Sequence, residues 1–317
     1  MYFPYFRGKQ YELLALKELS QLLGSEQMVK PIIEPVRELK KSGLSRCLGA
    51  LSNDKVEFVL VINPSVGELK GGYLSDDLLT FIKEREEETS WNLGLLLHET
   101  TDVRELFKQY KKCLGSGFPL TLIHRGLVAE IDSVPDLTMD LYRAYDVIDD
   151  KLRRRHFSEL LTTSKGVTLR DGFPAESRNS DFQNKAESIF SEEHLYYSGE
   201  DWYGFADFAT IGSNYSEGGY APRVVVIHWT YEPKPGKPVM IRHFTSEDDG
   251  GTGNVGGKFL EAARELVAFL DVEGINTVAA GVVRTHVEGN TYPGLGIIKK
   301  LSIQNHLELV STILSRS

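Results

Sequence analysis

The chain alternates segments with helical spacing of apolar residues and short runs that are almost wholly apolar. In the segment Gly8–Gly24, leucine recurs at positions 13, 14, 16, 19, 22 and 23. This is the spacing of one face of an α-helix. Gly24 directly follows the last leucine, and glycine commonly ends a helix. The pattern predicts a helix ahead of the first strand.

Eight apolar runs have the length of strands. Their residues are nearly all apolar instead of alternating with polar ones, as in parallel strands that are covered on both faces. Amphipathic segments, such as Leu74–Glu88 and Thr100–Gly115, separate them and predict helices. The runs are Val29–Glu34, Glu57–Asn63, Asn92–His98, Phe118–Arg125, Ala144–Asp149, Gly166–Asp171, Trp202–Ala209 and Arg223–Tyr231.

Eight strands separated by crossovers in 317 residues predict an α/β fold, a (β/α)8 TIM-like barrel. An open, doubly wound sheet is the alternative. We expect one domain over residues 1–317, with an N-terminal plug and helix in 1–28, the barrel in 29–270 and further helices in 271–317. Within it, Val239–Phe244 is expected to pair with the eighth strand, and Lys258–Leu270 to form the closing helix.

Charge and cysteine content narrow the function classes. The formal net charge is -9, which argues against nonspecific binding of nucleic acid or anionic lipid. The one dense basic run, Lys151–His156, is interpreted as a solvated helix face. Cys47 and Cys113 fall in separate helix-like stretches, so the pattern supports neither a disulfide framework nor a cysteine metal site. No apolar run reaches the ~18 residues that span a bilayer. We therefore expect a cytoplasmic protein that is not inserted in a membrane.

Polar residues stand where the apolar runs end. In a barrel, the reacting groups lie at the carboxyl ends of the strands, so these side chains are expected to meet at one mouth. A solvated strand end is the alternative for any single residue. The candidate catalytic residues are Glu34, His124, Asp171, Asp207 and His228, and the candidate ligand-binding residues are Asn63, His98, Arg125, Arg170, Arg178 and Asn179.

The residue types indicate three kinds of chemistry. The carboxylates and imidazoles of this set could hold a divalent cation, with ligands from separate strands, or provide a general acid and base. Arg125 and Arg170 favour an anionic group, because a guanidinium matches carboxylate or phosphate geometry. No H-x-H or H-E-x-x-H spacing occurs, so no metal ligands are predicted, and the cofactor stays open.

Two further motifs bear on the chemistry. Gly251–Gly256 has the letters of a G-x-G-x-x-G fingerprint, but acidic residues stand where a dinucleotide fold needs a strand. A surface loop is therefore favoured. The chain has no G-x-S-x-G nucleophile elbow, which disfavours acyl transfer.

Four blocks resemble one known family. They are "MYFPYFRGKQYELLAL", "KPIIEPV", "LRDGFPAESRNSDF" and "FADFATIGSNYSEGGYAPRVVVIHWTY". In this order, they are similar to blocks of the beta family of phage and bacterial proteins. The resemblance extends from Met1 to about Tyr231. The recurring positions are Arg7, Gly8, Lys9, Gln10, Glu34, Asp171, Gly172, Phe173, Arg178, Asn179 and Asp207.

The resemblance implies a genetic context and no reaction. Members of this family resemble accessory genes of prophages and mobile elements, often beside a second small gene. It implies a component of a phage-defence or two-protein module that binds an anionic ligand or a protein partner encoded nearby. The alternative is a hydrolase of a phosphorylated or nucleotide-like substrate that uses Glu34, Asp171 and the histidines.

Overall fold

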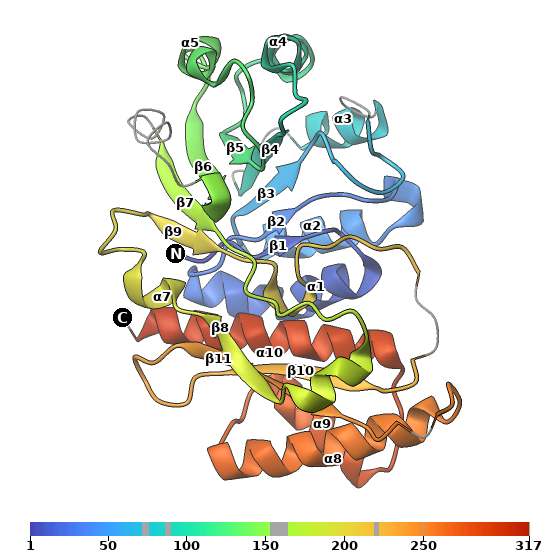
Figure 1. The fold of residues 1–317 in the computed structure, drawn as a ribbon. Helices are drawn as coiled ribbons and strands as arrows, with labels where there is room; N and C mark the ends of the chain where they lie inside the picture. Colours follow the sequence, from blue (N-terminus) through green and yellow to red (C-terminus); the bar gives the residue numbers. More distant parts are fainter. Residues whose placement is uncertain (72–75, 86–89, 153–163, 219–221, 249, 317) are drawn as a thin grey trace. The chain divides into compact units, whose positions relative to one another are not determined.

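The computed structural model describes residues 1–71, 76–85, 90–152, 164–218, 222–248 and 250–316 (Figure 1). Contacts within the chain divide it into two compact units. The barrel unit comprises Met1–Arg170 and Tyr197–Asp207, and the C-terminal unit comprises Asp171–Tyr196 and Phe208–Ser317. Most of the basic run Lys151–His156 lies outside the described residues.

The barrel unit is built on eight parallel strands in one sheet. Helices alternate with the first strands of this sheet, and together they form the TIM-like α/β barrel predicted from the sequence (Figure 1). In sheet order, the strands are β1 (Tyr5–Phe6), β2 (Ile32–Ile33), β3 (Phe58–Val61), β4 (Trp91–Leu97), β5 (Leu120–His124), β6 (Arg143–Asp149), β7 (Lys165–Leu169) and β9 (Gly204–Ala206).

The N-terminal segment nearly closes the barrel. Tyr2 bridges Val29 on one side and Phe205 on the other. The amide of Phe3 donates to the carbonyl of Phe205, and that of Tyr5 donates to the carbonyl of Asp207, both at 2.8 Å. The backbone ahead of β1 therefore joins the first and last strands of the sheet.

Five helices follow the first five strands in turn. Each begins near the carboxyl end of a strand, and their starts carry local signals. In α4, Asp102 accepts the amide of Glu105 at 3.0 Å as an N-cap, and Gly115 ends the helix with φ 65°. The helices are α1 (Gln10–Glu26), α2 (Leu44–Asn53), α3 (Asp76–Lys83), α4 (Val103–Leu114) and α5 (Val134–Leu137).

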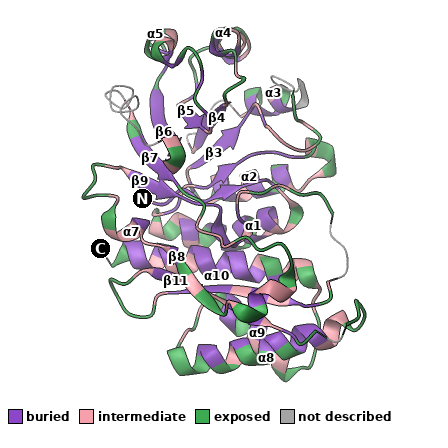
Figure 2. Cartoon of the chain, viewed as in Figure 1, coloured by how far each residue is buried: buried purple, intermediate pink, exposed green. Residues whose placement is uncertain are grey.

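The barrel strands are buried on both faces (Figure 2). Every residue of β3, β4, β5 and β6 is buried, although successive side chains point to opposite sides. One face packs inside the barrel and the other faces outward from it. This double burial is the physical reason why the strands appear in the sequence as continuous apolar runs.

The C-terminal unit is built on a three-stranded antiparallel sheet in the order β10–β11–β8. An apolar core joins Trp229 of the sheet to Phe259, Leu266 and Leu301 of its helices. The elements are β8 (Glu187–Ser191), α7 (Glu193–Tyr196), β10 (Val226–Tyr231), β11 (Val239–Thr245), α8 (Val255–Glu273), α9 (Val278–Glu288) and α10 (Leu295–Ser315). The helices predicted after residue 257 are confirmed.

The first predicted boundary differs from the structure. Residues 1–28 contain a barrel strand, β1, ahead of helix α1, and not a plug. The strand is short and follows Pro4, and proline is unusual in a central strand. Its pairing with β2 and with the segment after Phe205 shows its place in the sheet.

The last predicted strand also differs. Arg223–Tyr231 contains β10 of the antiparallel sheet, and the eighth barrel strand is β9, within the predicted run Trp202–Ala209. At the start of β10, the buried Ile227 and Trp229 alternate with the partly exposed Val226 and His228. Such alternation is expected for an antiparallel sheet. The predicted pairing of Val239–Phe244 with this strand is confirmed.

Among the described residues, none of the helices combines the length and apolar character needed to cross a membrane.

Candidate functional site

Strand register decides which side chains point into the barrel. Paired residues, such as Tyr5 with Ile32 and Thr121 with Tyr145, share a face, as do residues two apart on a strand. The guanidinium of Arg125 lies 6.0 Å from the ring centre of Tyr5, although their strands are not neighbours, so this face is the interior. Near the carboxyl ends, it carries Arg7, Glu34, Asn63, His98, Arg125 and Asp149, which we call the mouth.

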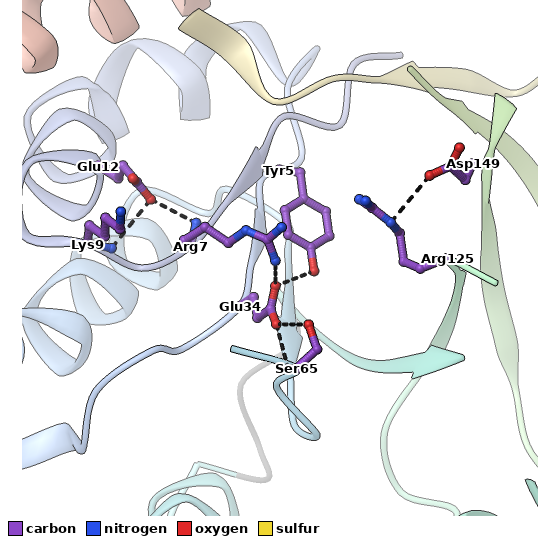
Figure 3. Close-up of polar contacts among 8 residues, drawn as sticks. All are labelled: Tyr5, Arg7, Lys9, Glu12, Glu34, Ser65, Arg125 and Asp149. Carbon is purple, nitrogen blue, oxygen red and sulfur yellow. Dashed lines mark hydrogen bonds and ion pairs between the residues drawn. The ribbon is translucent and has the colours of Figure 1, made fainter. Parts of the chain in front are cut away.

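Glu34 is the most densely bonded residue of the mouth (Figure 3). It is fully buried. Oε2 accepts the hydroxyl of Tyr5 at 2.7 Å and pairs with the guanidinium of Arg7. Oε1 accepts the amide and the hydroxyl of Ser65 at 2.7 and 2.8 Å. Both carboxylate oxygens are thus occupied, and Glu34 holds together three separate segments of the barrel unit.

The turn between β1 and α1 positions Arg7. Glu12, in the first turn of α1, accepts the amide of Arg7 at 2.7 Å. Gly8 has φ +61°, and a Cβ there would come within 3.1 Å of the carbonyl oxygen of Glu34. The sequence Arg7–Gly8 therefore fits a tight strand-to-helix turn at the mouth. The first block of the resemblance, which was predicted to lie in an N-terminal plug, therefore lies at the carboxyl end of a barrel strand.

A cavity of about 670 Å³ opens at the ends of β3, β4 and β5. Its volume is in the range of small-molecule sites. Its wall combines cations, carboxylates and hydroxyls with a few apolar groups. The polar residues that line it include Asn63, Ser65, Lys70, His98, Asp102 and Arg125.

His98 presents a polar atom that the fold leaves unused. Its Nε2 is buried and has no hydrogen-bond partner among the described residues. Burial, and then the positive charge of Arg125, lowers the pKa of the imidazole below 6.5, whereas the charge of Glu34 opposes this shift. The backbone amide of His98 donates to Oγ1 of Thr101 at 2.9 Å, which fixes the residue. A neutral imidazole therefore lines the cavity at neutral pH.

Three other mouth residues have structural contacts. Nε of Arg125 lies 3.4 Å from Oδ2 of Asp149, and both side chains are largely buried. The side-chain amide of Asn63 donates to the carbonyl of Leu96 at 2.9 Å and accepts its amide at 2.8 Å. Asn63 thus fastens β3 to β4 at the edge of the cavity.

His124 lies on the opposite face from the mouth. It precedes Arg125 by one residue, so its side chain points outward from the barrel interior. Its Nε2 lies 2.8 Å from Oδ1 of Asp146, and Oδ2 of the same carboxylate accepts Arg143 at 2.6 Å. Burial opposes ionisation of Asp146, but these partners hold the pKa of the carboxyl below its usual range. The structure thus places His124 in a buried network with Asp146 and Arg143, and His124 does not line the cavity.

Asp207 and Arg170 also lie away from the cavity. Asp207 accepts the hydroxyl of Tyr2 at 2.6 Å, and both residues are buried. Tyr2 adjoins Phe3, whose ring packs on Tyr145 inside the barrel, so Tyr2 and Asp207 face outward. Arg170 has an exposed side chain, with its Nε 3.9 Å from Asp150.

Three other candidates belong to the C-terminal unit. The carboxylate of Asp171 accepts the amides of Phe173 and Ser213 at 3.1 and 2.9 Å. Asn179 donates from its side-chain amide to the carbonyl of Val224 at 2.8 Å, and Arg178 is exposed. Asp171 and Asn179 thus connect loops within this unit.

His228 forms a histidine pair in the same unit. Its Nδ1 lies 2.8 Å from Nδ1 of His243, and the ring of Phe182 packs against both imidazoles. Burial lowers the pKa of His228 to about 3 and that of His243 to about 4. Two neutral imidazoles satisfy this contact when one ring donates its Nδ1–H and the Nδ1 of the other ring accepts it.

The geometry gives little support for a ligand site in the glycine-rich loop or for a metal site. The buried Lys258 donates to the carbonyls of Gly251 and Arg223 at 2.6 and 2.7 Å, which ties down the glycine-rich loop. Within the described parts of the chain, no group of three or more His, Cys, Asp and Glu side chains is placed to hold a metal ion.

The structure thus brings together Glu34, Asn63, His98 and Arg125 of the predicted set. Sequence reasoning assigned no role to Ser65, and it placed Tyr5 and Arg7 in an N-terminal plug. The signal for Arg7 was present in the sequence, because an aromatic run followed by Arg-Gly and a helix is a strand-to-helix turn. Ser65 carried no signal, since its role depends on the path of the loop after β3.

Comparison with known proteins does not assign the chain to a family. No protein-family model matches the chain, and no curated protein matches it.

Proposed function

We propose that the barrel mouth binds a small anionic ligand. The observation that carries this proposal is His98: the residue lines the cavity, and its buried Nε2 has no hydrogen-bond partner among the described residues. A buried polar atom without a partner is costly, and a ligand oxygen would satisfy it. Arg125 lines the same cavity and supplies positive charge.

The charges around the cavity favour an anion over a cation. Glu34 already accepts four hydrogen bonds, and Asp149 is paired with Arg125. Neither of these two carboxylates lines the cavity. The carboxylates that line it are Glu99, which is exposed to solvent, and Asp102, which caps α4. Lys70 and Arg125 supply N–H donors, and guanidinium groups suit carboxylate and phosphate oxygens.

Titration with inorganic phosphate, followed through the His98 imidazole resonances, tests this site directly. Binding should raise the pKa of His98, because a nearby negative charge stabilises the imidazolium. Arg125→Gln should weaken the affinity by about tenfold or more. Arg104→Gln, which removes an exposed partner of Glu130, is the matched control and should bind like the wild type. Equal affinity in Arg125→Gln and wild type would overturn the proposal.

A second candidate is hydrolysis of a phosphorylated or nucleotide-like substrate. The lowered pKa of His98 favours it, because an unprotonated imidazole beside a bound anion suits a general base. The catalytic set would then centre on His98 and Arg125, which both lie at the mouth. Phosphate release from p-nitrophenyl phosphate tests it. Turnover should fall in His98→Gln and follow deprotonation of a group with a pKa below 6.5 in the wild type. Absence of turnover with retained phosphate binding would leave only the first candidate.

The resemblance to the beta family supports a cellular context for this ligand site. In this proposal, the protein acts in the cytoplasm as part of a phage-defence or two-protein module, and ligand binding alters its contact with a partner encoded nearby. The unpaired cysteines Cys47 and Cys113 fit a reducing compartment. Plaque counts on cells carrying the native gene neighbourhood, with wild type or Arg125→Gln, test this role. If cells with Arg125→Gln resist phage as well as cells with the wild type, the defence role does not depend on the ligand site.

A further inference from the structure

A second pocket, of about 380 Å³, lies beside helices α1 and α2 of the barrel unit. It is distinct from the mouth cavity and shares none of its lining residues. Its wall has a pronounced charge bias, because its described lining residues include no aspartate or glutamate. The cationic lining residues are Lys17, Arg37, Lys40, Lys41 and Arg46.

Most of this charge is not neutralised within the protein. Lys41 pairs with Glu38 at 3.2 Å and with Glu68 at 3.6 Å. In the described parts of the chain, the other four cations make no ion pair or hydrogen bond through their side chains. This concentration occurs in a chain with 45 acidic and 36 basic residues. All five cations are exposed, so water and salt weaken their mutual repulsion, and an anion bound among them would reduce it further.

Helix α2 adds to this repulsion. Its first turn contains no acidic residue, and Gly43 occupies the N-cap without a side-chain cap. Instead, Arg46 stands in the first turn, and Lys40 and Lys41 precede the helix. Positive charge at the start of a helix is unfavourable, because the macrodipole places partial positive charge there. A negative group in the pocket would compensate both the helix end and the side chains.

We propose that this pocket binds the oligophosphate group of a small molecule. Several cations around one concavity match a chain of phosphates better than a single carboxylate, and Arg37 and Arg46 offer planar donor pairs to phosphate oxygens. The pocket volume fits a small ligand. The site does not depend on the ligand proposed for the mouth, because the two cavities have separate linings.

Gly43 allows a test that preserves the fold. Its φ of -82° and ψ of 9° suit other residues, and a Cβ there would meet no atom within 4 Å. Gly43→Asp therefore places a carboxylate in the pocket and supplies a preferred N-cap to α2. Gly281→Asp is the matched control, because it adds the same charge to an exposed helix position in the C-terminal unit with equal space.

Calorimetric titration of the full chain with sodium tripolyphosphate measures the site. We expect tripolyphosphate to bind about tenfold or more tightly than inorganic phosphate, and the affinity to fall as salt is raised. Gly43→Asp should weaken tripolyphosphate binding by about tenfold or more, with an unchanged or higher melting temperature. Gly281→Asp and the mouth variant Arg125→Gln should both bind like the wild type.

Four results would overturn the proposal. The first is no binding of tripolyphosphate by the wild type at millimolar concentration. The second is equal affinity in Gly43→Asp and Gly281→Asp. The third is loss of binding in Arg125→Gln, which would assign the anion to the mouth. A single-stranded oligonucleotide that binds and is not displaced by tripolyphosphate would also contradict a small-molecule site.

Discussion

The hydroxyl of Tyr5 donates a hydrogen bond of 2.7 Å to Oε2 of Glu34, and so joins the first barrel strand to the end of the second. Burial and the charge of Glu34 raise the pKa of Tyr5, so this hydroxyl remains a donor at physiological pH. The bond lies in the segment that closes the barrel and also forms the wall of the mouth. Closure of the fold and geometry of the mouth are therefore expected to change together.

Glu34→Gln should destabilise the barrel unit. The substitution preserves size but leaves Arg7, whose side chain is 10% exposed, without its carboxylate partner. Breaking a buried ion pair from one side costs about 3–5 kcal/mol. Urea denaturation should show a decrease of this order in the free energy of unfolding. Lys108→Gln, on the exposed face of α4, should leave the transition near that of the wild type. Wild-type stability in Glu34→Gln would contradict the anchoring role.

Gly8→Ala should destabilise the turn that presents Arg7. A non-glycine residue at positive φ costs about 1–2 kcal/mol, and the new Cβ would also approach the carbonyl oxygen of Glu34 to 3.1 Å. Gly236→Ala is the control, because Gly236 has φ +77° and a Cβ there would meet no atom within 4 Å. Thermal melts should show a larger decrease for Gly8→Ala. Equal decreases would show that the contact with Glu34 carries no additional cost.

The histidine pair should make the C-terminal unit sensitive to acid. The pKa values of His228 and His243, about 3 and 4, lie below the ordinary 6.5 because of burial, with Lys299 and Lys185 lowering them further. As the pH falls, these two histidines therefore bind protons at a higher pH in the unfolded chain than in the folded chain. Stability is fully present above about pH 6.5 and is lost as the pH decreases toward 4.

The expected loss is about 2 kcal/mol for each of the two histidines by about pH 5, measured by urea denaturation across this range. His243→Gln should be less stable at pH 7 but should show a smaller decrease between about pH 7 and 5. Glu176 raises the pKa of His243, so Glu176→Gln should lower the folded-state pKa of this imidazole and extend the loss of stability to a lower pH. An unchanged slope in His243→Gln would assign the acid sensitivity to other groups.

The two cysteines should differ in reactivity. Cys47 is buried in α2, and burial raises the pKa of its thiol to about 12. Cys113, in α4, is partly exposed. Because the thiolate is the reactive form, a thiol reagent should label Cys113 quickly and Cys47 only on unfolding. Mass spectrometry of labelled peptides measures both sites, and Cys113→Ser should abolish the fast phase. Rapid labelling of Cys47 in the folded chain would contradict its burial.

The sequence was sufficient to predict the fold class of the barrel unit and its central strands, but it misplaced the first and the eighth strand. Strands covered on both faces lack polar residues, so β3, β4, β5 and β6 appear as separate apolar runs with helical segments between them. Because parallel strands share one direction, their polar ends could be assigned to one mouth. Glu34, Asn63, His98 and Arg125 were identified on this basis.

Register and closure required the tertiary structure. His124 and Arg125 are adjacent in the chain, yet one faces outward and the other faces the mouth. An apolar run with both faces buried gives no sign of which face is which, because that depends on pairing with neighbouring strands. Likewise, Tyr5 and Arg7 join the mouth because residues far along the chain, around Phe205, pair with the N-terminal segment.

By itself, then, the sequence determined local structure and the strand ends at which polar groups stand, since both follow from short-range patterns of apolar and polar residues. The tertiary structure decided which of those groups share a cavity, and it assigned Asp171, Arg178, Asn179 and His228 to a separate unit. The physical reason is that strand partners and barrel closure are long-range choices, made by backbone hydrogen bonds that every residue except proline can form.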